Sequence, residues 1–147
     1  MAHQRILILD FGSQYTQLIA RRVRELNVYS EIIPWHAYKG LKDDIQGVIL
    51  SGSPYSVRDQ DAPRPDLSSI LGHVPVLGVC YGAQYLAQTH GGSVEASNTR
   101  EYGRAHLEEV KTEDELLSGM SAQSQVWMSH GDTILSLGNG FETICST

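Results

Sequence analysis

The amino-acid sequence predicts an α/β protein: a doubly wound, mostly parallel sheet with helices on both faces and a smaller antiparallel extension. Three observations support this prediction. Short apolar runs alternate with helix-like stretches up to residue 90. Residues 78–82, Gly-Val-Cys-Tyr-Gly, stand where one apolar run gives way to a helix-like stretch. Beyond residue 92 the pattern changes to short strand-like segments separated by turn signals.

The N-terminal part predicts three strands and one helix. Residues 5–10 form an apolar run that ends in a carboxylate, the pattern of a strand buried on both faces of a parallel sheet. Between residues 15 and 26 apolar side chains recur at helical spacing, and the arginines on the opposite face indicate a solvated surface. Residues 28–33 predict a second strand, which Pro34 ends, and residues 47–50 predict a third.

The third predicted strand runs into residues 51–54, Ser-Gly-Ser-Pro, a turn at the sheet edge where ligands bind in this architecture. Its small residues leave backbone N–H groups exposed, and such groups can line an oxyanion hole. On spacing alone an ordinary Gly/Ser/Pro turn is the favoured interpretation, and the oxyanion hole is the alternative. Residues 55–65 predict a surface loop over the site, and residues 67–71 predict a short helix.

The fourth predicted strand, residues 74–79, brings Cys80 to a sharp strand-to-helix turn between two glycines. Such a turn exposes its central side chain, and the glycines allow the strained backbone and close helix packing. The helix N-terminus is expected to favour the thiolate over the thiol. The alternative is a buried structural cysteine, because free cysteines often behave as small hydrophobes. The turn pattern favours a nucleophile.

The helix after Cys80 is expected to end at residues 90–92, His-Gly-Gly, with His90 as a cap. The remaining chain predicts short strands at residues 93–96, 105–111, 125–128 and 141–145. Turn signals at residues 101–103, 117–119 and 137–140 divide them. Residues 127–132, Trp-Met-Ser-His-Gly-Asp, predict a loop rich in hydrogen-bonding groups.

Length and composition narrow the possible functions. A chain of 147 residues with 41% hydrophobic content predicts one globular domain. The net charge of −6 and the scattered 11 Lys and Arg residues argue against nucleic acid as a partner. The N-terminus resembles neither a signal peptide nor a membrane span, so we expect a cytoplasmic protein with no membrane partner. Its two cysteines are expected to be free thiols, and no histidine spacing indicates a metal site.

Four stretches together resemble the class I glutamine amidotransferase family, whose fold is flavodoxin-like, and within it the glutaminase domain of GMP synthases. They are residues 6–15 with 21–26, residues 50–54, residues 78–84 and residues 127–132. The resemblance spans essentially the whole chain. It implies that residues 1–147 form a single amidotransferase type 1 domain whose C-terminal part is missing.

The resemblance also implies a reaction. A cysteine thiolate attacks the carboxamide of L-glutamine, ammonia leaves, and water releases glutamate from a thioester. The ammonia passes to a partner, an ATP-dependent GMP synthetase domain or subunit, which aminates XMP to GMP. No cofactor is expected in this chain, since ATP and Mg²⁺ would belong to the synthetase domain.

Carried over by position, the resemblance assigns roles to eight residues and no metal ligand. Cys80 is the nucleophile, and the backbone N–H groups of Ser53 and Tyr81 form the oxyanion hole. The residues that would hold glutamine are Gly52, Gln84, Ser129, Gly131 and Asp132.

Two departures from the family pattern limit these assignments. Ser53 replaces a family glycine, which would cost about 1 kcal/mol if its φ were positive. The His-Pro-Glu motif that completes the family's triad is expected downstream of Thr147. Within the chain, His106 with Glu108, or His130, are weak substitutes for the base.

These departures leave alternatives to a working glutaminase. One is a catalytically incomplete fragment or pseudo-enzyme that binds glutamine or a synthetase without turnover. A flavodoxin-like nucleotide binder would not explain the cysteine turn.

Overall fold

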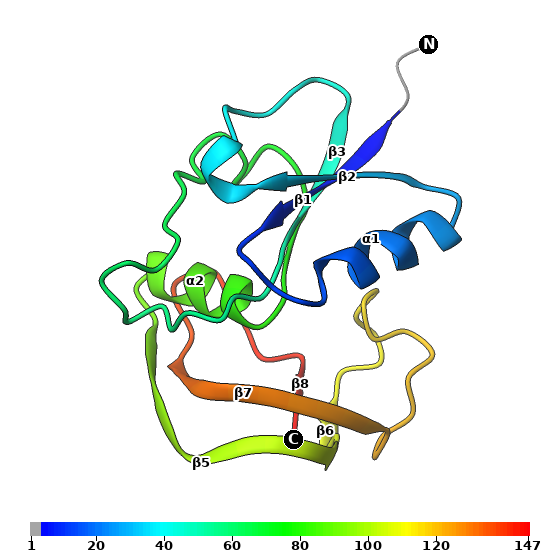
Figure 1. The fold of residues 1–147 in the computed structure, drawn as a ribbon. Coiled ribbons are helices and arrows are strands. Elements are labelled where there is room, and N and C mark those ends of the chain that lie inside the picture. Colours follow the sequence, from blue (N-terminus) through cyan, green and yellow to red (C-terminus); the bar gives the residue numbers. More distant parts are fainter. Residues whose placement is uncertain (1–3) are drawn as a thin grey trace.

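A parallel four-stranded sheet forms the body of the computed structural model, which describes residues 4–147 except for the side chains of residues 98–101 (Figure 1). The strand order is β2-β1-β3-β4. The four strands, which all pair in parallel, are β1 (Arg5–Asp10), β2 (Tyr29–Pro34), β3 (Ile45–Leu50) and β4 (Val76–Gly78). The predicted mostly parallel α/β fold is thereby confirmed.

β1 lies between β2 and β3, which explains its unbroken apolar sequence. Leu7, Ile8 and Leu9 are fully buried because β2 and β3 flank both edges of β1 and other parts of the chain pack on both faces. Leu50 of β3 is also fully buried and joins the same hydrophobic core. The core therefore extends to the carboxyl ends of the central strands, where the site lies.

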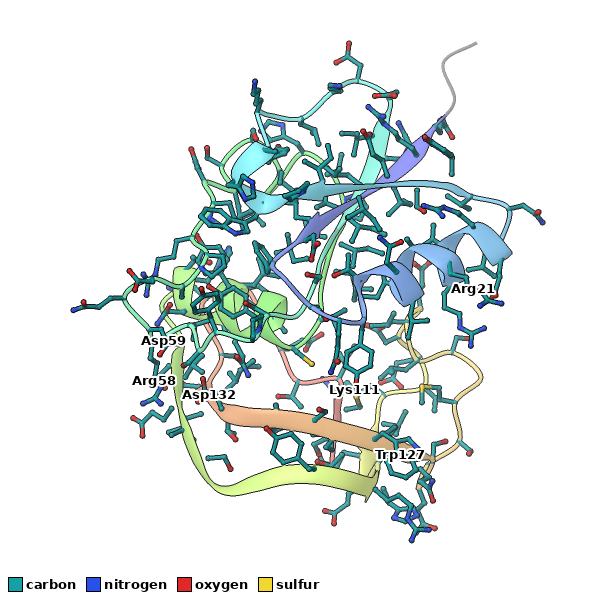
Figure 2. All side chains as sticks on the ribbon, viewed as in Figure 1. Arg21, Arg58, Asp59, Lys111, Trp127 and Asp132 are labelled. Atoms are coloured by element: carbon teal, nitrogen blue, oxygen red, sulfur yellow. The ribbon has the colours of Figure 1, made fainter. Side chains whose placement is uncertain are left out.

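α1 (Thr16–Glu25) connects β1 to β2 and confirms the helix predicted over residues 15–26. Its start is fixed by Asp10, whose Oδ1 accepts hydrogen bonds from the Thr16 hydroxyl and the Gly12 N–H, both at 2.9 Å. On its exposed face, which carries Arg21 in Figure 2, Arg21 and Arg22 pair with Glu25 at 3.1 and 2.7 Å. The arginines thus form the solvated helix surface that the sequence predicts.

α2 (Tyr81–Thr89) follows β4 directly, as predicted. It ends where His90 Nδ1 lies 2.8 Å from the Leu86 carbonyl and Gly91 adopts a φ of 86°. His90 is therefore a helix cap, in agreement with the sequence. No helix in the described part of the chain has the length and hydrophobicity of a membrane span.

The short helix predicted over residues 67–71 is wrong. The chain forms turns there, with Leu71 N–H bonded to the Leu67 carbonyl at 2.9 Å and Gly72 at a φ of 81°. The positive φ of Gly72 reverses the chain after this bond, so the helical turn does not propagate. A short 3₁₀ helix, η1 (Trp35–Ala37), was not predicted.

The antiparallel extension exists, but its strands differ from the prediction. β5 (Ser93–His106) pairs with β7 (Gln125–Ser136) in one long ribbon, and β6 (Glu109–Val110) pairs with β8 (Cys145–Ser146) (Figure 1). The predicted turn at residues 101–103 and the predicted loop at residues 127–132 are both wrong, because these segments lie inside β5 and β7. Their polar backbones are satisfied by cross-strand pairing, for example between Gly103 and Met128.

Other parts of the extension follow the sequence more closely. The turns predicted at residues 117–119 and 137–140 are confirmed, with Gly119 and Gly140 at φ values of 83° and 85°. Of the strand predicted over residues 141–145, only Cys145 is extended and paired. Gly138 approaches His90 so closely that a Cβ at Gly138 would lie 2.5 Å from the His90 Cβ. The chain after β7 therefore packs directly against the end of α2.

Candidate active site

Cys80 occupies a strained turn between β4 and α2. Its φ of 48° and ψ of −110° lie in a region that residues with side chains rarely adopt. Backbone bonds on both sides hold the turn: Val79 N–H donates to the Leu50 carbonyl at 3.0 Å, and Gln84 N–H donates to the Cys80 carbonyl at 3.0 Å. Cys80 is exposed, which confirms that the turn presents this side chain instead of burying it.

The two glycines beside Cys80 allow the close packing that the sequence predicts. A Cβ at Gly82 would lie 2.5 Å from the Leu50 carbonyl oxygen, and a Cβ at Gly78 would lie 2.7 Å from the Ala83 nitrogen. Real Cβ atoms do not approach so closely, so only glycine fits at either position.

The thiol of Cys80 does not have the low pKa expected from the sequence. Partial desolvation by neighbouring atoms raises the pKa of the Cys80 thiol above its ordinary value. A helix N-terminus contributes about 0.3–1 kcal/mol at an exposed site, which corresponds to less than one pKa unit. The direction of this shift is opposite to the one expected from the helix N-terminus, so the expected thiolate is not favoured here.

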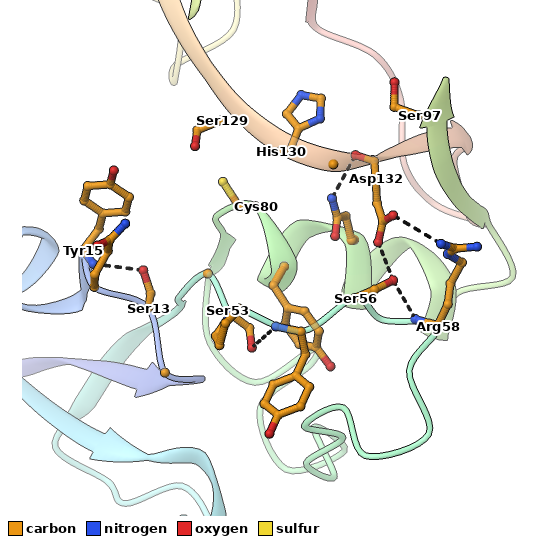
Figure 3. Close-up of a pocket in the computed structure, with 18 of the residues that line it drawn as sticks. Ser13, Tyr15, Ser53, Ser56, Arg58, Cys80, Ser97, Ser129, His130 and Asp132 are labelled. Carbon is orange, nitrogen blue, oxygen red and sulfur yellow. Dashed lines mark hydrogen bonds and ion pairs between the residues drawn. The ribbon is translucent and has the colours of Figure 1, made fainter. Parts of the chain in front are cut away.

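A cavity of about 950 Å³ opens at Cys80 and is bordered by four segments of the chain (Figure 3). These are the β1–α1 loop, the loop after β3, the Cys80 turn with α2, and the β5–β7 ribbon. All the site residues predicted from the sequence lie at this pocket: Gly52, Ser53, Cys80, Tyr81, Gln84, Ser129, Gly131 and Asp132. Their individual roles stay predictions.

The turn after β3 lies against Cys80. A Cβ at Gly52 would lie 3.7 Å from the Cys80 Cβ and 3.5 Å from the Ser13 hydroxyl. Among the described residues that carry a side chain, Ser53 is not one of those with a positive φ. The strain that the sequence analysis considered for serine at this position therefore does not arise.

The Tyr81 side chain holds the loop of residues 55–65. Its hydroxyl is buried and donates to the Pro63 carbonyl, and the hydroxyl of Tyr85 donates to the Pro65 carbonyl at 2.8 Å. Burial raises the pKa of Tyr81 to about 12, so this phenol stays protonated and donates. The two tyrosines anchor the predicted surface loop to α2.

Asp132 on β7 holds the same loop from the other side. Its carboxylate accepts a hydrogen bond from the Ser56 hydroxyl and lies 3.6 Å from the Arg58 guanidinium (Figures 2 and 3). The Gln84 side-chain amide donates to the Asp132 carbonyl at 3.2 Å. Loop, α2 and β7 are therefore joined at one edge of the pocket.

Sequence reasoning missed several lining residues. The loop that follows β1 contributes Ser13, Gln14 and Tyr15. The carboxyl ends of parallel strands meet at one edge of the sheet, so the position of this loop directly after a central strand could have predicted that it lines the site. Arg58 and Tyr102 also line the pocket. No local signal marks either of them, since both depend on chain segments distant in sequence.

The candidate bases differ in position. His130 lines the pocket and lies on β7 across from Cys80 (Figure 3). His106 pairs with Gln125 at the end of β5 and is not among the residues that line the pocket. Within the described residues, no three His, Cys, Asp or Glu side chains come together as a metal site.

Comparisons with known proteins give consistent similarities. The model of the glutamine amidotransferase class-I family matches residues 7–147. The chain is 58% identical over 142 residues to a glutamine-hydrolyzing GMP synthase from Christiangramia forsetii, covering 97% of this chain and 28% of that protein. It is 57% identical over 144 residues to the corresponding enzyme of Phocaeicola vulgatus, covering 98% of this chain and 28% of that protein. The chain thus spans about 28% of the length of these relatives.

Solved structures show the same fold. A Thermoplasma acidophilum protein described as a GMP synthase component superimposes with a TM-score of 0.74 at 26% identity, covering 100% of this chain and 74% of that one. A glutamine amidotransferase from Thermotoga maritima gives a TM-score of 0.72 at 20% identity, covering 99% and 67%. The second likeness concerns the fold alone.

Proposed function

This chain belongs to the class I glutamine amidotransferase family, and from that premise we propose that it hydrolyses L-glutamine to supply ammonia for the amination of XMP to GMP. The observation that carries the proposal is the setting of Cys80. This side chain is exposed on a strained strand-to-helix turn, and it borders a pocket lined by the Gly52–Ser53 turn and by β7. That arrangement suits nucleophilic attack on a carbonyl.

The proposed reaction has two steps. The Cys80 sulfur forms a bond to the carboxamide carbon of glutamine, and the negative charge on the oxygen is met by the N–H groups of Ser53 and Tyr81. The carbon–nitrogen bond then breaks, a proton moves to the nitrogen, and ammonia leaves a glutamyl thioester. Water attacks the thioester carbon, glutamate is released, and the thiol is regenerated with the proton from water.

The proposal includes a general base that takes the thiol proton, in keeping with a pKa of Cys80 that burial raises. We propose that this base is the histidine of a His-Pro-Glu motif expected beyond Thr147. Support comes from the family membership and from the pKa, since a paired histidine is a common means of activating a cysteine.

The substrate contacts also belong to the proposal. Ser129, Gly131 and Asp132 on β7 would bind glutamine together with Gly52 and Gln84. Because the Asp132 carboxylate already bonds to Ser56 and Arg58, it would meet a substrate ammonium group as an oriented acceptor.

We propose as partner a GMP synthetase domain or subunit that uses ATP and Mg²⁺, while this chain itself needs no cofactor. The support is that the chain matches only about 28% of relatives named as GMP synthases. We also propose a cytoplasmic location, where Cys80 and Cys145 stay reduced, and no nucleic-acid partner. A non-catalytic fragment or pseudo-enzyme is not favoured, since the relatives carry names of glutamine-hydrolysing enzymes.

The proposal is tested by labelling and by turnover. Diazo-oxo-norleucine, a glutamine analogue, should modify Cys80, and Cys80→Ala should abolish ammonia release while the fold persists. Ammonia release should be compared between the 147-residue chain and a version extended through the His-Pro-Glu motif. Absence of a Cys80 adduct in the extended protein would contradict the proposed function, and normal turnover by the short chain would contradict the missing base.

A further inference from the structure

Ser51 is the residue at which three segments of the site meet. It directly follows β3, and its side chain is fully buried. Its Oγ accepts a hydrogen bond from the Phe11 N–H at 2.9 Å and donates one to the Gly52 carbonyl at 2.9 Å. Its own carbonyl accepts a hydrogen bond from the Gly82 N–H at 3.1 Å. Ser51 therefore ties the segments after β1, β3 and β4 to one another.

The bond to the Gly52 carbonyl fixes a whole peptide group. A trans peptide is planar, so the carbonyl of Gly52 and the N–H of Ser53 point in opposite directions. Once the Ser51 hydroxyl holds the carbonyl, the N–H of Ser53 can point only away from that hydroxyl. This N–H is the oxyanion donor of the proposed function, and Gly52 lies against Cys80.

We propose that Ser51 is a positioning residue whose buried hydroxyl sets the orientation of the Gly52–Ser53 peptide for the oxyanion hole. The inference rests on the proposed function, since the role assigned to Ser53 does. Ser51 is not among the residues that line the pocket, so it acts through the peptide and touches no substrate. A donor that is already oriented needs no rearrangement when charge develops on the carbonyl oxygen.

Ser30 offers a matched control. It is also buried, with 2% of its surface exposed, and its Oγ donates to the Ala20 carbonyl at 3.2 Å and accepts from Arg24 at 3.1 Å. It lies in β2 and is not among the pocket-lining residues. Replacing either serine with alanine removes one buried hydroxyl with two hydrogen bonds, but only Ser51 borders the oxyanion peptide.

The test compares Ser51→Ala with Ser30→Ala in the protein extended through the His-Pro-Glu motif, which is the version expected to hydrolyse glutamine. Loss of one oxyanion donor lowers kcat by about 10²–10³, and a misoriented donor should cost less. We therefore expect kcat of Ser51→Ala to fall roughly 10- to 100-fold with KM for glutamine within about twofold, and kcat of Ser30→Ala to change less than about twofold. Alkylation of Cys80 by iodoacetamide creates no oxyanion, so its rate should be the same in both variants.

Each other result has a defined meaning. A folded Ser51→Ala protein with the kcat of Ser30→Ala, or with a raised KM alone, overturns the inference. If Ser51→Ala does not fold, Ser51→Cys replaces it, because a thiol keeps the shape but is a weaker donor, and its kcat is judged in the same way. Absence of Cys80-dependent hydrolysis in the unmodified protein overturns the proposed function itself, whereas an active protein with an indifferent Ser51 overturns only this inference.

Discussion

Replacing Cys80 with glycine is expected to stabilise the protein while abolishing glutamine hydrolysis. The φ of 48° and ψ of −110° at Cys80 disfavour any residue with a Cβ, at a cost of about 1–3 kcal/mol. Glycine removes this cost but adds unfolded-state entropy worth about 0.4–1 kcal/mol. The free energy of unfolding should therefore rise by about 0.5–2 kcal/mol, which for a domain of this size raises Tm by on the order of 3 °C per kcal/mol.

Cys80→Ala is the matched control, because it removes the sulfur and keeps the Cβ. Both variants should lack ammonia release, but only Cys80→Gly should gain stability. The measurement is thermal or urea unfolding of the unmodified protein and of both variants under reducing conditions. Equal stability of the glycine and alanine variants would refute the reasoning, since it would mean that the turn stores no strain at Cys80.

Three further predictions concern charge and protonation at the site. Burial raises the pKa of Cys80, so the rate at which iodoacetamide alkylates the 147-residue chain should rise with pH and reach no plateau below about pH 9. A rate that levels off near pH 7 would contradict this prediction. The pKa of Tyr81 is raised to about 12 in the folded protein, so the protonated Tyr81 contributes its full stabilisation below pH 10 and progressively less as pH rises to about 12. In alkaline unfolding, Tyr81→Phe should therefore lose less stability with rising pH than the unmodified protein. The same pH dependence in both proteins would contradict this prediction. Arg58→Ala should release the Asp132 carboxylate and raise KM for glutamine a few-fold. Arg58→Lys keeps the charge, so its KM should lie between those of Arg58→Ala and the unmodified protein. Equal KM values in all three proteins would argue against a role for the Arg58–Asp132 contact.

The sequence predicted the parts of the fold that depend on local pattern. The central strands and both helices follow from apolar runs and helical spacing, and the Cys80 turn follows from its two flanking glycines. The failures concern pairing between distant segments. Residues 101–103 carry turn residues, yet β7 supplies them with hydrogen-bond partners, and residues 67–71 have helical apolar spacing that Gly72 interrupts. Tertiary pairing overrides local preference in such segments.

The same limit applies to the site. Gly52 and Cys80 were predictable because they follow adjacent parallel strands, whose carboxyl ends meet at one edge of the sheet. The contact between Arg58 and Asp132 could not be predicted, because it joins a surface loop to a strand and the two residues are 74 positions apart in the sequence. The pKa of Cys80 was predicted in the wrong direction because desolvation depends on packing that only the folded chain shows.

The long β5–β7 ribbon also brings four consecutive residues, 129–132, to the border of one pocket. In a regular strand, alternate side chains face opposite sides, and Ser129 and His130 do lie on opposite sides of β7 (Figure 3). Here the pairing is irregular: Ala96 pairs with Asp132 but Glu101 pairs with His130, so four residues of β5 lie opposite Gly131 alone. The extra residues belong to β5, so the ribbon is irregular in β5, opposite the part of β7 that passes Cys80. The segment predicted as a polar loop therefore meets the site as part of the continuous strand β7, opposite an irregularity in β5.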